Sequence, residues 1–195
     1  MDGYELCKTV KSKIEFCHIP VILLTALNGT EKQITGVEHG ADAYIAKPFN
    51  VKLLLTSIEN LIENRKRIKQ SFSQSTNLPE HLNISMLDKD FMQKVNQIIE
   101  ANLDNSSLKI EDIAKELGLS IAQFSRKFKQ LTGQLPNRYL KNYRLQIAAN
   151  IIRKDPWVSL KTVMYDVGLE SASHFSRSFK DKFGETPKSF AKKLM

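Results

Sequence analysis

The chain has 195 residues, 42% of them hydrophobic, with 29 Lys and Arg against 21 Asp and Glu. That length suits one large domain or two small ones, and the apolar share is typical of folded rather than disordered proteins. Two cysteines without C-x-x-C spacing and four scattered histidines predict neither a disulfide framework nor a metal site. No apolar run approaches the ~20 residues that span a bilayer. We therefore expect a cytoplasmic protein without membrane contact and without a cofactor.

The N-terminal part predicts helices alternating with short strands. Residues 3–13 have helical spacing of apolar side chains, and residues 20–25 form an unbroken apolar run typical of a strand buried on both faces. A helical stretch is expected to end near Gly36 to Gly40, and residues 43–47 predict a second strand. Asn50 is a candidate N-cap for an amphipathic helix. This alternation is typical of βαβ architecture.

A polar segment separates this part from the rest. The basic run at 65–69 leads into a Ser-rich stretch, and we expect residues 66–89 to form a linker. The basic run could contact phosphates, although a solvated helix end is the favoured interpretation. Residues 1–89 hold 11 Lys and Arg against 10 Asp and Glu, whereas residues 90–195 hold 18 against 11. A basic part joined to a neutral one indicates a nucleic-acid reader coupled to something else.

The second part shows helical patterns without a strand signal. Helices are expected at 91–103, at 110–117 and, after Pro136, at 137–154. A closing helix is expected at 187–194. The C-terminal half is therefore predicted to be all-α.

An internal repeat dominates the second part. The segment Ser120–Lys129 recurs as Ser171–Lys180, and each copy follows a Gly-Leu turn. The pattern predicts two helix-turn-helix units, at about 108–132 and 158–184. In each copy aromatic and leucine side chains fall at i, i+4, i+7, so they are expected in the core rather than stacked on bases: Phe124, Phe128 and Leu131, then Phe175, Phe179 and Phe183.

The opposite face of each second helix carries small and basic side chains. Arg can bond two acceptors on guanine, whereas Lys and Ser reach phosphates. A surface salt-bridge role for the arginines is the alternative, disfavoured because both copies place Arg beside Ser. The predicted DNA-binding residues are Ala122, Ser125, Arg126, Lys129, Ser173, His174, Ser176, Arg177 and Lys180.

Residues 90–195 resemble the AraC-type DNA-binding domain, on the twice-repeated S-x-x-x-F-S-R-x-F-K pattern followed by G-x-x-P and an aromatic residue. The resemblance implies two recognition helices in successive major grooves, joined by a linker helix at about 137–154. The chain departs from the family at Met164, where a small residue is usual, and in a second turn that is one residue longer. Ala122 replaces a larger residue, and a thymine methyl is the contact left to it.

Residues 1–65 resemble the second half of a response-regulator receiver domain. The motifs are M-D-G-Y-E-L at the start, P-V-I-L-L-T-A at 20–26 and G-A-D-A-Y-I-A-K-P-F at 40–49. The resemblance implies that Thr25 and Lys47 would bind a phosphoryl group and that Tyr44 would report it. The phospho-acceptor aspartate and the magnesium-binding acidic pair are not in this sequence, so these three residues are expected to be vestigial.

The sequence thus predicts a truncated flavodoxin-like α/β receiver (1–65), a linker (66–89) and an all-α tandem helix-turn-helix domain (90–195). The resemblance is to the C-terminal end of a hybrid two-component sensor and response regulator. The expected function is sequence-specific transcription regulation on double-stranded DNA, not enzymatic catalysis. The alternative is a signalling adaptor whose receiver segment docks a kinase or forms a homodimer. The strand at 20–25 is expected at an exposed sheet edge, which favours self-association.

Overall fold

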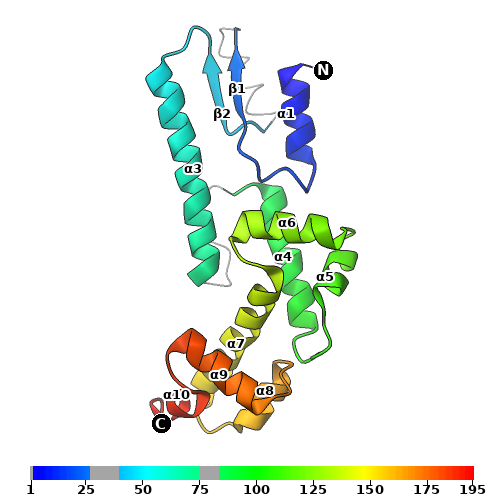
Figure 1. The fold of residues 1–195 in the computed structure, drawn as a ribbon, viewed down its shortest axis with the longest axis vertical. Helices are drawn as coiled ribbons and strands as arrows, with labels where there is room; N and C mark the ends of the chain where they lie inside the picture. The colour runs from blue at the N-terminus through cyan, green and yellow to red at the C-terminus, as the bar shows by residue number, and fades with distance from the viewer. Residues whose placement is uncertain (1, 27–39, 75–83) are drawn as a thin grey trace. The chain divides into compact units, whose positions relative to one another are not determined.

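The structure, a computed structural model, describes residues 2–26, 40–74 and 84–195. The helix expected to end near Gly36 to Gly40 lies outside these residues. The elements are α1 (Gly3–Ser12), β1 (Ile22–Thr25), β2 (Ala43–Ala46), α3 (Val51–Gln74), α4 (Met86–Ala101), α5 (Ile110–Glu116), α6 (Ile121–Thr132), α7 (Pro136–Lys154), α8 (Leu160–Asp166), α9 (Ala172–Phe183) and α10 (Pro187–Lys192) (Figure 1).

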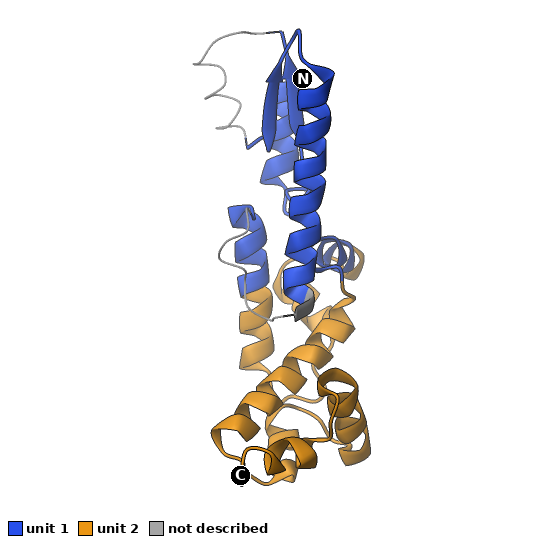
Figure 2. Ribbon diagram, turned by 90° about the vertical axis from the view of Figure 1, so that its left-hand side faces the viewer, with its two compact units in different colours: residues 1–93, 123–133 blue, residues 94–122, 134–195 orange. Residues whose placement is uncertain are grey.

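Two compact units make up the chain. Unit 1 comprises residues 1–93 and 123–133, and unit 2 comprises residues 94–122 and 134–195 (Figure 2). Unit 1 therefore combines the receiver-like segment with α6 from Gln123 onward. No helix of the described ranges is long and apolar enough to cross a membrane.

A parallel pair of strands confirms the α/β prediction for the N-terminal part. β1 pairs with β2 in the register Ile22↔Ala43 to Thr25↔Ala46. Asp2 caps α1, where its carboxylate accepts from the backbone N–H of Glu5 at 2.8 Å. The expectation that β1 is buried on both faces is wrong, because Leu24 is 42% exposed while Thr25 is buried. Successive side chains point to opposite faces, so only one face of this end of β1 is covered.

Helix α3 is longer than the sequence predicted. Its start agrees with prediction, since the Asn50 side chain accepts from the backbone N–H of Lys52 at 2.8 Å. The helix continues to Gln74, into the segment that we expected to be a linker. Ile68 and Phe72 are almost fully buried and lie four residues apart, so they extend one apolar stripe of the helix. The Ser-rich composition of this segment had led us to predict a linker and not the apolar face of a helix.

The core of unit 1 surrounds α6 and contains a buried ion pair. The rings of Phe91 and Phe124 lie 5.8 Å apart between centroids. The Lys127 ammonium lies 5.0 Å from the centroid of the Phe91 ring and contacts the Asp88 carboxylate at 2.6 Å, and both side chains of this ion pair are at most 1% exposed. The Cys17 thiol donates to Asp88 at 3.3 Å and accepts from Lys127 at 3.2 Å. The Arg65 guanidinium lies 3.8 Å from the second Asp88 oxygen.

The charged state of this cluster follows from its contacts. Burial raises the pKa of Asp88, but the Lys127 charge and the hydrogen bonds that Asp88 accepts outweigh burial, so its pKa is lowered. Burial is also the main cause that raises the pKa of the Cys17 thiol, which stays protonated. Asp88 is therefore a carboxylate held by Lys127, with Arg65 at longer range.

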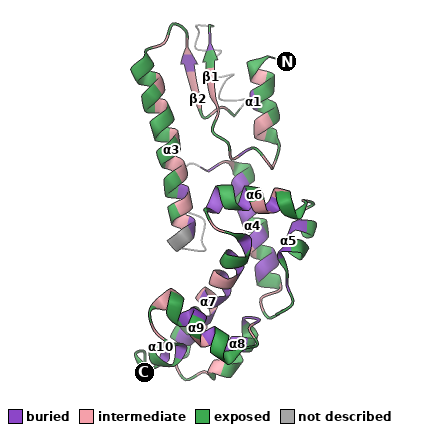
Figure 3. Ribbon diagram, in the orientation of Figure 1, coloured by how far each residue is buried: buried purple, intermediate pink, exposed green. Residues whose placement is uncertain are grey.

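Unit 2 is organised around α7. The apolar side of α7 packs against α8, α9 and α10, and Figure 3 shows the buried residues along it. Leu145, Ala148 and Ile152 supply the α7 side of this core. The buried Arg144 donates to the carbonyl oxygens of Gly168 at 3.2 Å and Asn105 at 2.6 Å.

The two helix-turn-helix turns use glycine in the left-handed region. Gly118 has φ +67° and Gly168 has φ +65°. Their surroundings differ. A Cβ at Gly118 would meet nothing within 4 Å, whereas one at Gly168 would lie 2.5 Å from the Leu103 carbonyl oxygen and 3.0 Å from Arg144.

This matched pair gives a stability prediction. Gly118→Ala should lower the free energy of unfolding by ~1–2 kcal/mol, because it adds only left-handed strain. Gly168→Ala should cost a further ~1–3 kcal/mol, because its methyl group overlaps backbone. Urea unfolding followed by helical circular dichroism would measure both values. Equal losses would show that Leu103 and Arg144 move aside freely.

The ion pair gives a second stability prediction. Asp88→Asn should lower the free energy of unfolding by ~3–5 kcal/mol, because it leaves the Lys127 ammonium buried without a counter-charge. The double variant Lys127→Met/Asp88→Leu should recover most of that loss. Unfolding followed by helical circular dichroism would measure both.

The control is an exposed pair in the same unit. Lys66 and Glu63 lie 3.9 Å apart with side chains 65% and 50% exposed. Glu63→Gln should therefore change the free energy of unfolding by less than ~1 kcal/mol. If Asp88→Asn costs no more than Glu63→Gln, the buried pair does not stabilise the unit.

Candidate nucleic-acid interface

Helices α6 and α9 each bury one aromatic face. Phe124, Phe128 and Leu131 of α6 are each 1% exposed. In α9, Phe175 and Phe179 are buried with ring centroids 5.8 Å apart. Phe183 is half-buried, with its ring 4.5 Å from that of Phe179. The structure confirms that these side chains pack in the core, which leaves the opposite face of each helix for other contacts.

The outward faces carry the residues that the sequence predicted for DNA contact. Both arginines, Arg126 and Arg177, are exposed, as are Lys129 and Lys180. At the helix starts Ala122, Ser173 and His174 are exposed, whereas Ser125 and Ser176 are half-buried. Each helix thus presents small residues followed by an Arg and a Lys. Their role in reading bases or phosphates stays a prediction.

Lys127 is a buried residue that the sequence did not predict. This residue falls three residues after Phe124 and one before Phe128, on the buried stripe of a helix with 3.6 residues per turn. Ser178, which is also buried, holds the equivalent position in α9. A lysine on a buried stripe requires a buried acid, and that was the signal that could have identified the cluster.

The two copies also differ at the position that Gln123 occupies in α6 and His174 in α9. The Gln123 side-chain amide of α6 donates to the Glu15 carboxylate at 3.1 Å and is half-buried. His174, at the matching position of α9, is exposed. The start of α6 thus makes a polar contact within unit 1.

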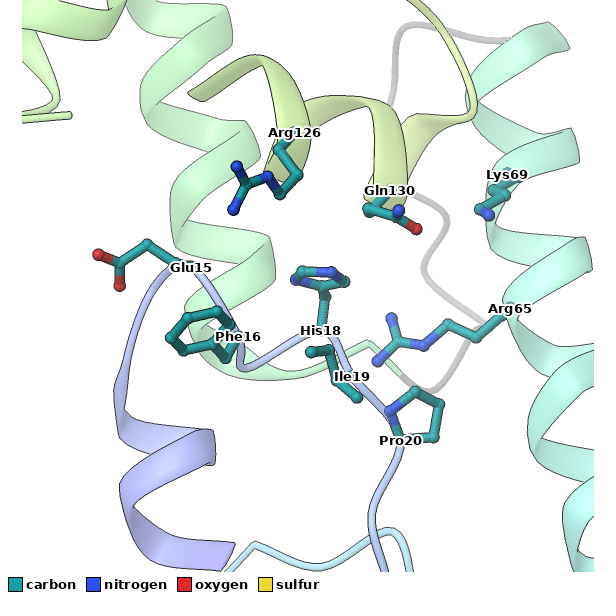
Figure 4. A pocket seen from close by; sticks show the side chains of 9 residues that line it. All are labelled: Glu15, Phe16, His18, Ile19, Pro20, Arg65, Lys69, Arg126 and Gln130. Carbon is teal, nitrogen blue, oxygen red and sulfur yellow. The ribbon is translucent and has the colours of Figure 1, made fainter. Parts of the chain in front are cut away.

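A cavity of about 320 Å³ lies beside α6. Figure 4 shows Arg126 and Gln130 of α6, Arg65 and Lys69 of α3, and the segment between α1 and β1 around it. From that segment come Glu15, Phe16, His18, Ile19 and Pro20.

Charge in this cavity is predominantly basic. Arg65, Lys69 and Arg126 line it with a single acidic side chain, that of Glu15. Burial, followed by the positive charge of Lys127, lowers the pKa of His18 to about 4. The imidazole is therefore neutral at neutral pH, and its buried Nδ1 has no hydrogen-bond partner among the described residues.

Two of the three receiver-switch residues, Thr25 and Lys47, lie at the C-terminal ends of β1 and β2, and Tyr44 lies within β2. Thr25 is buried at the end of β1, and its carbonyl oxygen accepts from the backbone N–H of Lys47 at 2.6 Å. The Tyr44 hydroxyl lies 3.3 Å from the Tyr4 hydroxyl of α1. The structure thus brings Thr25 and Lys47 to one sheet end. No group of three or more metal-ligating side chains occurs among the residues described.

Two family models match separate parts of the chain. A model described as a response regulator receiver domain matches residues 1–59, and one described as a helix-turn-helix domain matches residues 113–193. Histidine kinase P4 of Formosa agariphila is 37% identical over 191 residues, which are 97% of this chain and 14% of that protein. A probable transcriptional regulator, ycf27 of Cyanophora paradoxa, is 35% identical over 48% of this chain and 37% of its own length. The chain thus spans only a minor part of either relative.

Solved structures resemble the helical part. The C-terminal domain of AraT, a response regulator from Geobacillus stearothermophilus, is 25% identical with a TM-score of 0.50, over 54% of this chain and 86% of that one. A Chromobacterium violaceum regulator described as containing an AraC-type DNA-binding domain is 27% identical with a TM-score of 0.51, over 55% of this chain and 94% of its own. The chain thus carries a segment that matches a response regulator receiver domain and a segment that matches a helix-turn-helix domain, and it resembles solved AraC-type domains.

Proposed function

We propose that the chain is a sequence-specific DNA-binding regulator of transcription in a two-component system, with α6 and α9 entering successive major grooves. The observation that carries the proposal is the duplicated face: each helix buries its aromatics and exposes an Arg and a Lys at matching positions. A B-DNA major groove admits a helix of this kind. The net charge of +8 favours a polyanionic partner.

The exposed side chains of α6 and α9 have different roles in DNA binding. Arg126 and Arg177 bond the two major-groove acceptors of guanine, while Lys129, Lys180 and the serines contact phosphates. Ala122, with no polar atom, contacts a thymine methyl. Specificity thus comes from the two arginines, and most of the non-specific affinity comes from the lysines.

The receiver segment connects this output to signalling. The likeness to a protein named a histidine kinase, over 97% of this chain, supports a place at the output end of a hybrid two-component protein. A regulator that acts on genes must then couple its receiver to the helix-turn-helix domain, and in unit 1 the receiver segment and α6 already share one core.

A signalling adaptor is the second candidate, and one observation favours it. The receiver segment exposes large apolar side chains on α1, β1 and α3: Leu6, Leu24, Val51, Leu53, Leu55, Ile58 and Ile62. Such a surface suits a kinase or a second copy of the chain. Under this hypothesis the chain binds its protein partner with DNA binding secondary, so the salt dependence of duplex binding separates the two.

The arginines give the first test of DNA reading. After selection of a preferred duplex, Arg126→Ala and Arg177→Ala should each weaken binding by ~1–3 kcal/mol and relax base preference at one position. Fluorescence anisotropy with single-base duplex variants measures both effects. Arg67→Ala is the control, because it removes an exposed arginine of α3 and should leave base preference unchanged. Unaltered affinity and selectivity in both α6 and α9 variants would contradict the assignment.

The lysines give a separate test. Lys129→Ala and Lys180→Ala should weaken binding to preferred and random duplexes by similar factors, because phosphates carry no sequence information. Each should also reduce the slope of log affinity against log salt by about 1. A salt titration from low to moderate ionic strength measures the slope. A lysine variant that loses preference for one base, with its salt slope intact, would show that the lysine reads sequence instead.

A further inference from the structure

We propose that the cavity beside α6 is a binding site for a small organic anion, a molecule that carries a phosphate or carboxylate group on an apolar body. Such a site goes beyond the proposed function, because it requires no DNA. All the residues that line it belong to unit 1. Its volume of about 320 Å³ lies at the lower end of the range that small-molecule sites occupy, about 300–1,000 Å³.

The side chains that line the cavity carry surplus positive charge. Arg65, Lys69 and Arg126 are the cations, and Glu15 is the one acid. The Glu15 carboxylate already accepts from the Gln123 amide at 3.1 Å. Among the described residues, neither Lys69 nor Arg126 forms an ion pair. An anionic ligand would balance this charge with charge-assisted hydrogen bonds.

Arg65 is a partly buried cation that lacks hydrogen-bond acceptors. Its side chain is 19% exposed, and its buried Nη1 has no hydrogen-bond partner in the described ranges. Asp88 lies 3.8 Å away, beyond hydrogen-bond distance, and its charge is already balanced by Lys127 at 2.6 Å. A buried N–H group without an acceptor costs free energy. A phosphate or carboxylate would supply two acceptors in the geometry that a guanidinium prefers.

The segment between α1 and β1 supplies the apolar wall of the cavity. Phe16 and Ile19 are 40% and 43% exposed and line it beside His18 (Figure 4). The lowered pKa of His18, about 4, keeps its imidazole neutral at neutral pH, so one ring nitrogen donates and the other accepts. A ligand with a ring or alkyl body can thus cover Phe16 and Ile19 while its charged end meets Arg65.

Packing holds the walls in place without a ligand. Cys17, at the centre of the segment, is buried and hydrogen-bonded to Asp88 and Lys127. The stem of Lys69 packs against Gly133 at the end of α6, where an added Cβ would lie 3.4 Å from that of Lys69. The site is therefore preformed, which lowers the cost of ordering side chains on binding.

Isothermal titration calorimetry of the full chain with phenyl phosphate tests the proposal. Inorganic phosphate, phenol and benzoate are the comparison probes. Phenyl phosphate should bind at least about tenfold more tightly than inorganic phosphate, because its ring covers Phe16 and Ile19. Phenol, which has the ring without the charge, should also bind at least about tenfold more weakly than phenyl phosphate. The tighter of phenyl phosphate and benzoate identifies the anionic group that the site prefers.

Two substitutions in α3 form a matched pair. Arg65→Gln removes a cation from the cavity and should weaken phenyl phosphate binding at least about tenfold, because a charge-assisted hydrogen bond is lost. Arg67→Gln removes the same charge from the exposed side of the helix, where Arg67 contacts Glu63 at 3.4 Å, and should leave the affinity unchanged. Phe16→Ala should lower the affinity for phenyl phosphate to that for inorganic phosphate.

Lys69→Met is a second cavity variant that avoids the core. Arg65 lies near the buried Asp88, so circular dichroism must first show that Arg65→Gln is folded, and Lys69→Met decides if it is not. Absence of saturable binding of both phenyl phosphate and benzoate at millimolar concentration would overturn the proposal. So would equal losses in the Arg65→Gln and Arg67→Gln variants, or unchanged affinity in Lys69→Met. None of these outcomes depends on duplex binding, so the ligand site and the proposed function are tested separately.

Discussion

The ion pair between Lys127 and Asp88 is the interaction on which the arrangement of unit 1 depends. A lysine on the buried face of a helix is tolerated only beside an acid that is itself buried and hydrogen-bonded. Asp88 meets that demand from α4, while Cys17 and Arg65 approach the same carboxylate from the receiver segment and α3. Four separate stretches of chain thus converge on one charge. The rotation of α6 about its axis is thereby fixed, and so is the set of side chains that it turns outward.

The two copies of the repeat have similar exposed side chains and different buried ones. Both expose an Arg and a Lys beyond a small-residue start, as one shared task would require. Inside, α6 uses a charged residue where α9 uses Ser178, and unit 2 instead places its buried cation, Arg144, on α7 against backbone carbonyls. Most of α6 therefore belongs to unit 1 together with the receiver segment, whereas α9 belongs to unit 2.

The sequence predicted the features that repeat or follow a local period. The aromatic stripes of α6 and α9, the long helix α7 and the strands β1 and β2 all follow from spacing within a few residues. It did not predict the partner of Lys127, because Asp88 lies far away in sequence and no local pattern marks it. The end predicted for α3 was also too early. Ile68 and Phe72 are separated by polar residues, and the composition of this stretch resembles that of a linker. Both the Lys127–Asp88 pair and the length of α3 depend on contacts with segments that are distant in sequence.

Protection of guanine N7 from dimethyl sulfate, measured with the full chain on a selected duplex, tests most directly whether both helices read DNA. Successive major grooves on one face of B-DNA recur every ~10–10.5 base pairs. Two protected blocks with that spacing are expected, with the block assigned to α6 lost in Arg126→Ala and the other lost in Arg177→Ala. A single protected block that only Arg177→Ala removes would contradict a reading role for α6.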